Sequence, residues 1–141
     1  KCILGGIEIE DNLFFKAHSD GDVLVHSLVD SLAGVTLGVD IGELFPDTKK
    51  EYLDSSSILF LENVLQKIKL KHPGLIVNCI DFVIICDQIK ILPIKKRIEE
   101  NIKLIISKYF KVGIVSLKGK TTEKGFNDSY CYVYTIATLD I

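Results

Sequence analysis

Apolar residues recur every three or four positions in three stretches of the chain, which is the spacing of a helix with one buried face. The first stretch covers residues 22–37, and Ser19 is its predicted N-cap. The second follows the serines at 55–57 and ends before Pro73, and the third follows Pro93. We therefore expect three amphipathic helices, each with its apolar face against a sheet.

Four other runs have the composition of β-strands. Residues 2–9 are interrupted by a glycine pair, which indicates a hairpin or a bulge, and residues 75–86 are almost continuously apolar, as in a strand covered on both faces. Residues 112–117 and 130–139 complete the set. The order β-α-α-β-α-β-β predicts a single α/β domain over residues 1–141, an α+β sandwich with a mixed sheet and helices on one face.

Composition narrows the class of protein. The chain has 141 residues, 48% of them hydrophobic, and its 17 basic and 19 acidic residues give a formal net charge of −2. No apolar run is long enough to cross a membrane, and no cluster of basic residues indicates a nucleic-acid surface. Four widely spaced cysteines show no disulfide or metal-binding pattern, so we expect buried thiols in a reducing compartment at Cys2, Cys79, Cys86 and Cys131.

The densest group of polar side chains lies around the start of the first helix. Asp22, His26 and Asp30 follow one another at intervals of one helical turn, so we expect them on one face. An imidazole between carboxylates is suited to bind a metal ion, and it is also typical of a histidine held in a polar seam. His18 precedes the helix start, where backbone N–H groups favour an anion, or it is a loop histidine without a task.

Three loops offer further candidates. Residues 118–126 combine hydroxyl, ammonium and carboxylate groups that suit phosphate oxygens and a divalent cation, or a solvated hairpin. Residues 87–93 follow the long apolar strand, where α/β sheets favour pockets, and are either a backbone surface for a ring ligand or an ordinary loop. Residues 39–54 form a long loop, and long ordered loops often carry function.

Four motifs, in order along the chain, resemble those of the 2-C-methyl-D-erythritol 2,4-cyclodiphosphate synthase family. They are His18-Ser19-Asp20-Gly21-Asp22-Val23 with His26 and Asp30, Asp40-Ile41-Gly42 with Phe45-Pro46-Asp47-Thr48, Lys90-Ile91-Leu92-Pro93, and Thr121-Thr122-Glu123 with Gly125-Phe126. The match extends over almost the whole chain. Four ordered motifs are far more specific than any one of them.

The resemblance implies a reaction of the non-mevalonate isoprenoid pathway. The 2-phosphate of 4-diphosphocytidyl-2-C-methyl-D-erythritol 2-phosphate attacks the β-phosphorus, closes the cyclic diphosphate and releases CMP, which makes the enzyme a metal-dependent phosphorus–oxygen lyase. A phosphate oxygen is already anionic at neutral pH, so no protein nucleophile is needed. The alternatives are a non-catalytic trimeric protein that binds a nucleotide or an isoprenoid, and a purely structural assembly domain.

The same resemblance assigns the cations and the substrate contacts. It implies that His26 binds Zn²⁺ and that Glu123 binds a second cation, Mg²⁺ or Mn²⁺. It implies that His18 and Ser19 hold the methylerythritol phosphate, and that His18 and Thr121 stabilise charge at the attacked phosphorus. The other implied contacts are Asp40, Ile41, Gly42, Phe45, Pro46, Asp47, Thr48 and Lys49 at the erythritol end, Cys86, Asp87, Gln88, Ile89, Lys90, Ile91 and Leu92 at the cytidine end, and Lys120, Thr122 and Phe126 near the diphosphate.

The resemblance also implies an assembly and a location. Family members are homotrimers with active sites between subunits, and the apolar strand at 75–86 suits a shared core, where an isoprenoid diphosphate is a further candidate ligand. The family's Gly-x-Asp-x-His strand, which completes the zinc site, is expected upstream of Lys1, and the loop at 123–128 is shorter than the family's and has no arginine. The pathway and the Lys- and Ile-rich composition favour an apicoplast-like plastid stroma or a bacterial cytoplasm.

Overall fold

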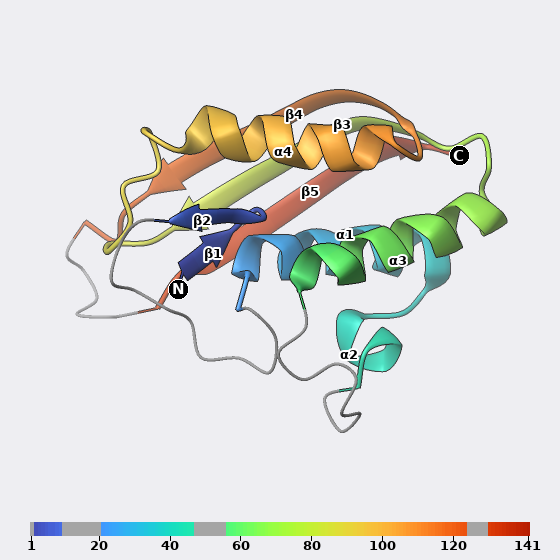
Figure 1. Cartoon of the computed structure of the whole chain (residues 1–141), viewed down its shortest axis with the longest axis horizontal. Helices are drawn as coiled ribbons and strands as arrows, with labels where there is room; N and C mark the ends of the chain where they lie inside the picture. Colours follow the sequence, from blue (N-terminus) through green and yellow to red (C-terminus); the bar gives the residue numbers. More distant parts are fainter. Residues whose placement is uncertain (1, 10–20, 47–55, 124–129) are drawn as a thin grey trace.

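The computed structural model describes residues 2–9, 21–46, 56–123 and 130–141. The elements are β1 (Cys2–Leu4), β2 (Ile7–Ile9), α1 (Val23–Leu37), α2 (Ile41–Leu44), α3 (Ser57–Lys71), β3 (Ile76–Ile85), α4 (Lys95–Ser107), β4 (Lys111–Lys120) and β5 (Tyr132–Asp140). Helix α4 packs on β4, α1 packs on β5, and α3 packs against α1 (Figure 1). The predicted α/β class with a mixed sheet and a layer of helices is confirmed.

The larger sheet has the strand order β4-β3-β5, with β4 parallel and β5 antiparallel to β3. At the end of the central strand, Ile85 pairs with Lys120 of β4 and with Tyr132 of β5. The carboxyl ends of β3 and β4 therefore meet the start of β5 at the same end of the sheet. The loops that leave this end carry residues 86–94 and 121–123.

The helices cover only one face of this sheet. Ile80, Phe82 and Ile84 of β3 point to that face and have no exposed surface, whereas the other face exposes Tyr134 and Ile136 of β5. The expectation that the long apolar strand is covered on both faces is therefore wrong for the single chain. Successive side chains of a strand point to opposite faces, so only every second apolar residue packs under the helices.

The N-terminal hairpin is tied to the start of α1. Gly5 and Gly6 have φ angles of 61° and 77°, a region that glycine adopts without strain, and they form the turn between β1 and β2. The buried carboxylate of Asp22 accepts hydrogen bonds from the N–H groups of Gly5 (2.9 Å), Gly6 (2.7 Å) and Val25 (3.0 Å). Asp22 is thus the N-cap, and the prediction of Ser19 is wrong because the helix begins only at Val23.

Helix α4 has the amphipathic form that its sequence predicts. Ile98, Ile102 and Ile106 are buried, and the carboxylate of Glu99 accepts a hydrogen bond from the N–H of Leu117 in β4 at 2.8 Å. The helix is thereby fixed to the sheet by packing and by one polar contact. None of the described helices is long and apolar enough to cross a membrane.

The cysteines depart from the expectation of four free thiols. Cys86 and Cys131, 45 residues apart in sequence, form a disulfide with their Cα atoms 4.6 Å apart. This pair continues the register of Ile85 with Tyr132 by one step, so the antiparallel pairing brings together two cysteines whose sequence spacing gave no signal. Cys2 and Cys79 form no disulfide; Cys2 is buried as predicted, whereas Cys79 is only half-buried, because it lies on the face of β3 that the helices do not cover.

Candidate active site

A pocket of about 820 Å³ lies where β3 and β4 end and the chain leads into α4. We call it the strand-end pocket. Its volume falls within the range of about 300–1,000 Å³ that is usual for small-molecule sites. Two loops that carry separate sequence motifs line it together: Cys86, Asp87, Ile89, Lys90, Ile91, Leu92, Pro93 and Lys95 on one side, and Lys118, Gly119, Lys120, Thr121 and Glu123 on the other.

The loop after β3 lies against β4 because position 119 has no side chain. Ile89 and Ile91 of this loop are buried, whereas Lys90 and Leu92 are exposed. A Cβ atom at Gly119 would come within 2.6 Å of the Cβ of Ile91. Any larger residue at 119 would therefore push the loop away from the strand and change the shape of the pocket.

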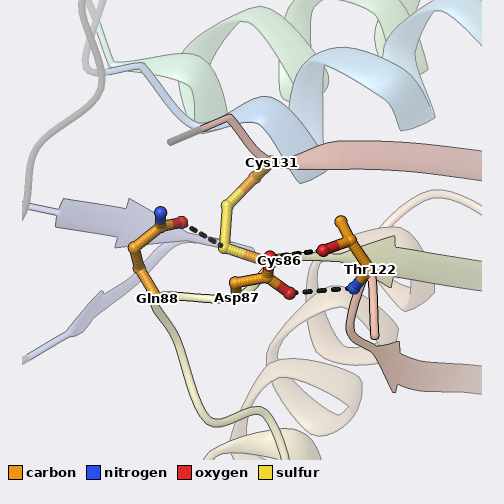
Figure 2. The surroundings of a disulfide bond; sticks show 5 residues. All are labelled: Cys86, Asp87, Gln88, Thr122 and Cys131. Carbon is orange, nitrogen blue, oxygen red and sulfur yellow. Dashed lines mark hydrogen bonds between the residues drawn. A yellow bond between two sulfur atoms is a disulfide. The ribbon is translucent and has the colours of Figure 1, made fainter. Parts of the chain in front are cut away.

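The turn after β4 is held by Asp87. Thr122 donates its backbone N–H to Oδ1 of Asp87 at 2.8 Å and its hydroxyl to Oδ2 at 2.6 Å (Figure 2). The N–H of Glu123 donates to the hydroxyl oxygen of Thr121 at 3.2 Å, and Glu123 has a φ of 56°. The side-chain and backbone hydrogen bonds from Thr122 lower the pKa of Asp87, against a smaller opposing effect of burial. Asp87 is therefore ionised at neutral pH, when its oxygens accept these hydrogen bonds.

The strand-end pocket is rich in ammonium groups. Lys90, Lys95, Lys118 and Lys120 line it, together with only two carboxylates. Lys118 also forms an ion pair with Asp81 of β3, with a nitrogen–oxygen distance of 2.8 Å. An excess of positive charge around a concave site attracts polyanions and raises their local concentration.

A second group of predicted residues lies around His26 of α1. The Nε2 atom of His26 is 2.8 Å from the hydroxyl of Ser57, the buried first residue of α3. The imidazole centroid lies 6.2 Å from the ring of Phe60, on which Phe45 stacks at 4.4 Å. His26 is therefore held between α1 and α3 by a hydrogen bond and by an aromatic pair.

The carboxylates expected on either side of His26 anchor backbone groups. Asp22 accepts N–H groups of the hairpin and of the first helical turn. Asp30 accepts the N–H of Ile41 at 2.7 Å and thereby ties α1 to α2. Unpaired N–H groups at helix starts and turns recruit carboxylates, which helical spacing alone does not reveal. The hydrogen bond found at Nε2 of His26 is to Ser57, a residue that the sequence analysis did not assign to a functional site.

The predicted erythritol-binding segment forms the start of α2. Asp40 is the N-cap and makes a capping box with Glu43, in which each side chain accepts the other's backbone N–H. Ile41 and Gly42 follow within the helix, and α2 packs against α1. We call His26, Ser57, Phe60 and residues 40–46 together the histidine region.

The structure brings the predicted residues together as two groups. The residues that line the strand-end pocket lie between Cys86 and Glu123, so no described residue of the histidine region lines it. Lys95 was missed because it looked like the solvated face of a helix, and only its position beside the pocket reveals it. Six predicted residues lie outside the described part of the chain: His18, Ser19, Asp47, Thr48, Lys49 and Phe126.

The described residues do not complete a zinc site. No three His, Cys, Asp or Glu side chains converge within residues 2–9, 21–46, 56–123 and 130–141. A catalytic zinc ion takes three protein ligands, and His26 offers one imidazole. Mg²⁺ keeps several waters and binds through one or two carboxylates together with substrate phosphates, so the carboxylate of Glu123 in the pocket fits such an ion.

The fold and the pocket define an α/β domain with a lysine-lined pocket at the carboxyl ends of two of its strands. The sequence model of the YgbB family matches residues 1–140, and the chain belongs to this family. It is 40% identical over 121 residues to the 2-C-methyl-D-erythritol 2,4-cyclodiphosphate synthase of Aquifex aeolicus. The matched residues cover 86% of this chain and 75% of that protein.

Two solved structures of related proteins are similar to this chain in fold and in sequence. A 2C-methyl-D-erythritol-2,4-cyclodiphosphate synthase in its CDP-bound form matches with a TM-score of 0.84 and 27% identity, over 97% of this chain and 88% of that chain. The CDP complex of IspF from Plasmodium falciparum matches with a TM-score of 0.75 and 32% identity, over 97% of this chain and 81% of that chain.

Proposed function

We propose that this chain converts 4-diphosphocytidyl-2-C-methyl-D-erythritol 2-phosphate into 2-C-methyl-D-erythritol 2,4-cyclodiphosphate and CMP, a step of the non-mevalonate isoprenoid pathway. The observation that carries the proposal is the strand-end pocket, where a cytidine-type loop, a Thr-Thr-Glu turn and several lysines meet in one cavity. Membership of the YgbB family and the identity to a synthase of that name support it. The enzyme is a lyase, because the phosphorus–oxygen bond breaks without the addition of water.

The cytidine end of the substrate binds along residues 86–92. The buried Ile89 and Ile91 anchor this loop, so its peptide groups can hydrogen-bond a base and a ribose while the loop keeps its shape. Two relatives of known structure were solved with CDP. The residues assigned to this end are Cys86, Asp87, Gln88, Ile89, Lys90, Ile91 and Leu92.

The diphosphate lies over the turn after β4. Lys120 is assigned to its oxygens, and Glu123 is assigned to Mg²⁺ or Mn²⁺, which when bound would neutralise charge on the diphosphate. Thr122, which the resemblance also implied as a contact, donates its N–H and its hydroxyl to Asp87 and does not line the pocket. The hydroxyl oxygen of Thr121 accepts the N–H of Glu123. Its own hydrogen is then available for a phosphate oxygen, which suits Thr121 to stabilise the charge at the attacked phosphorus.

The chemistry requires positioning more than a reactive side chain. The attacking oxygen of the 2-phosphate is already an anion, so the protein has to fold a flexible polyanion and reduce its charge repulsion. Lys90, Lys95 and Lys120 provide positive charge along the pocket. CMP leaves with the electron pair of the broken bond and is itself a stable phosphate.

The methylerythritol end is assigned to the histidine region. The described residues assigned to this end of the substrate are Asp40, Ile41, Gly42, Phe45 and Pro46. The assigned residues outside the described part of the chain are His18, Ser19 and 47–49. One substrate has to reach both this region and a pocket that it does not line. We therefore place the active site between two copies of the chain in a homotrimer, with the strand-end pocket of one copy facing the histidine region of the next.

An exposed apolar surface supports this assembly. The uncovered sheet face exposes Ile114, Tyr134 and Ile136, apolar side chains that a shared core would bury, and an isoprenoid diphosphate is a candidate ligand there. His26 supplies one ligand of a Zn²⁺ site, and the other ligands come from outside the described residues. A plastid stroma or a bacterial cytoplasm is the proposed location.

A ³¹P NMR time course on the proposed substrate tests the function. The chain, extended upstream of Lys1 and supplied with Zn²⁺ and Mg²⁺, is expected to yield CMP and a cyclic diphosphate in equal amounts. Removal of both cations with a chelator should stop the reaction. CDP binding without turnover in the presence of both cations would instead establish the non-catalytic binding protein.

A further inference from the structure

The side chain of Asp87 holds one residue at two points. Its Oδ1 accepts the N–H of Thr122 at 2.8 Å, and its Oδ2 accepts the Thr122 hydroxyl at 2.6 Å (Figure 2). Asp87 follows the end of β3, whereas Thr122 follows the end of β4. One carboxylate thus joins the two loops of the strand-end pocket.

Thr122 lies between the two residues that face the diphosphate in the proposed function. Thr121 and Glu123 both line the pocket, and they are joined by the hydrogen bond from the Glu123 N–H to the Thr121 hydroxyl oxygen. Glu123 has a φ of 56°, a conformation that residues other than glycine rarely adopt without support. Two hydrogen bonds to Asp87 join this turn to the loop after β3.

We infer that Asp87 is a positioning residue, which directs Thr121 and Glu123 toward the diphosphate through its two hydrogen bonds to Thr122. This inference rests on the proposed function, and it adds a role for the Asp87 side chain to the backbone contacts with cytidine assigned above. Loss of the carboxylate should affect ligands that reach the turn and spare ligands that stop short of it.

The variant Asp87→Asn tests this role with CDP and CMP, each titrated by calorimetry with Mg²⁺ present. An amide keeps one acceptor and presents a donor to Thr122, so the turn loses at least one charge-assisted hydrogen bond. The dissociation constant of CDP should rise about tenfold, since CDP has the β-phosphate that the turn and the cation hold. That of CMP, which lacks this phosphate, should change less than twofold.

A double-mutant cycle separates positioning from general damage to the fold. Thr122→Val removes the hydroxyl and should weaken CDP binding, whereas Thr122→Ser keeps it and should bind as the wild type. The double variant Asp87→Asn/Thr122→Val should be no weaker than Asp87→Asn alone, because the two residues act through one contact. Glu62→Gln, which removes a carboxylate paired with Lys108 away from the pocket, is the matched control.

Two results would overturn the inference. If Asp87→Asn binds CDP as the wild type does, the carboxylate does not position the turn. If it weakens CDP and CMP equally, Asp87 acts on the nucleoside and not on the turn. Absence of turnover by the wild type would reject the proposed function. The test of Asp87 measures binding, so its failure can be distinguished from a failure of the proposed function.

The neighbouring residue carries a second, independent tether. Cys86 lines the strand-end pocket and forms a disulfide with Cys131, the residue before β5 (Figure 2). Cys86 and Asp87 are consecutive, so the segment that follows β3 is joined both to Thr122 after β4 and to Cys131 before β5. Cys131 is half-buried, which leaves its side of the bond open to a thiol reagent.

We propose that the thiol–disulfide state of this pair sets the affinity of the pocket for nucleotides. A dithiol reductant transfers two electrons and two protons to the disulfide, giving two thiols and the oxidised dithiol. The Cys86 sulfur, 3.7 Å from Oε1 of Gln88, can then donate a hydrogen bond within the pocket loop. The disulfide form binds more tightly, because the bond to Cys131 fixes Cys86, a residue of the pocket lining, before the ligand arrives.

Calorimetry with CDP before and after treatment with dithiothreitol tests this proposal, with peptide mapping to identify the linked cysteines. Reduction should raise the dissociation constant of the wild type about threefold to fivefold. Cys131→Ser should match the reduced wild type under both conditions, and the control Cys79→Ser should respond as the wild type does. A mapped Cys86–Cys131 link with equal affinity in both states, or no such link in the oxidised protein, would refute the proposal.

Discussion

The strand-end pocket and the histidine region differ in how the chain brings their functional groups together. The pocket is built within one chain, because strand pairing brings the ends of β3 and β4 together and Asp87 then joins their loops. The histidine region offers one imidazole, hydrogen-bonded to Ser57, and within the described part of the chain no group of three His, Cys, Asp or Glu side chains could hold a metal ion. In our proposal, the nucleotide is therefore recognised within one chain, whereas the part of the site around His26 depends on additional segments and on a second copy.

The largest effect is expected at the turn of the strand-end pocket. Glu123→Gln keeps the size of the side chain and removes the charge that holds the proposed cation, so kcat should fall by about 1,000-fold. CMP binding should change little, since CMP does not reach the cation. Steady-state CMP release and calorimetry measure the two quantities. Glu100→Gln, an exposed carboxylate of α4, is the control, and an equal loss there would contradict a specific role.

The next effect separates the two regions directly. His26→Ala removes the imidazole and should lower kcat about 100-fold, while CDP binding to the strand-end pocket stays within about twofold of the wild type. His72→Ala, whose ring contacts the carbonyl oxygen of Thr36 at 3.3 Å, is the matched histidine control and should keep its activity. Loss of CDP binding in His26→Ala would mean that the regions are not independent.

A backbone change should damage the strand-end pocket without touching a charge. Gly119→Ala places a methyl group within 2.6 Å of the Ile91 Cβ and displaces the cytidine loop, so both CDP and CMP should bind about tenfold more weakly. This equal loss contrasts with the selective loss expected for Asp87→Asn. Gly34→Ala in α1 meets no atom within 4 Å and serves as the control, which should bind normally and be slightly more stable.

The smallest effect is expected when the hydrogen-bond partner of His26 is removed. Ser57→Ala removes the hydroxyl that lies 2.8 Å from Nε2, and a hydrogen bond of this kind contributes about 1 kcal/mol, so kcat should fall about threefold to fivefold. Ser31→Ala loses a hydroxyl contact to the carbonyl oxygen of Leu28 on the same helix and provides the comparison. Equal activity of both variants would show that Ser57 does not orient the imidazole.

The spacing of apolar residues along the chain was sufficient to predict the main elements of the fold. The 3.6-residue repeat and the glycine pair predicted α1, α3, α4 and the hairpin, because burial of one face imposes that spacing on any sequence. It did not predict α2, a short helix stabilised by the capping box of Asp40 and Glu43. It also misjudged the burial of β3, since an apolar run does not say whether its second face is covered by this chain or by another.

The contacts of individual side chains were harder to predict than the segments that contribute to the candidate site. The family resemblance assigned residues 86–92 and 120–123 to the same substrate, and strand pairing brings these two segments together. The motifs did not predict that Asp22 and Asp30 anchor backbone N–H groups, or that Cys86 meets Cys131. Such pairings depend on three-dimensional register, which residue types at a given spacing do not encode.

Complementation between two inactive variants tests the central claim most directly. Glu123→Gln and His26→Ala, each extended upstream of Lys1, are unfolded together, refolded as mixed trimers and assayed for CMP release. If each active site combines the strand-end pocket of one copy with the histidine region of the next, random mixing should restore about a quarter of wild-type activity. No activity above that of the separate variants would place both regions in one chain's site and contradict the account.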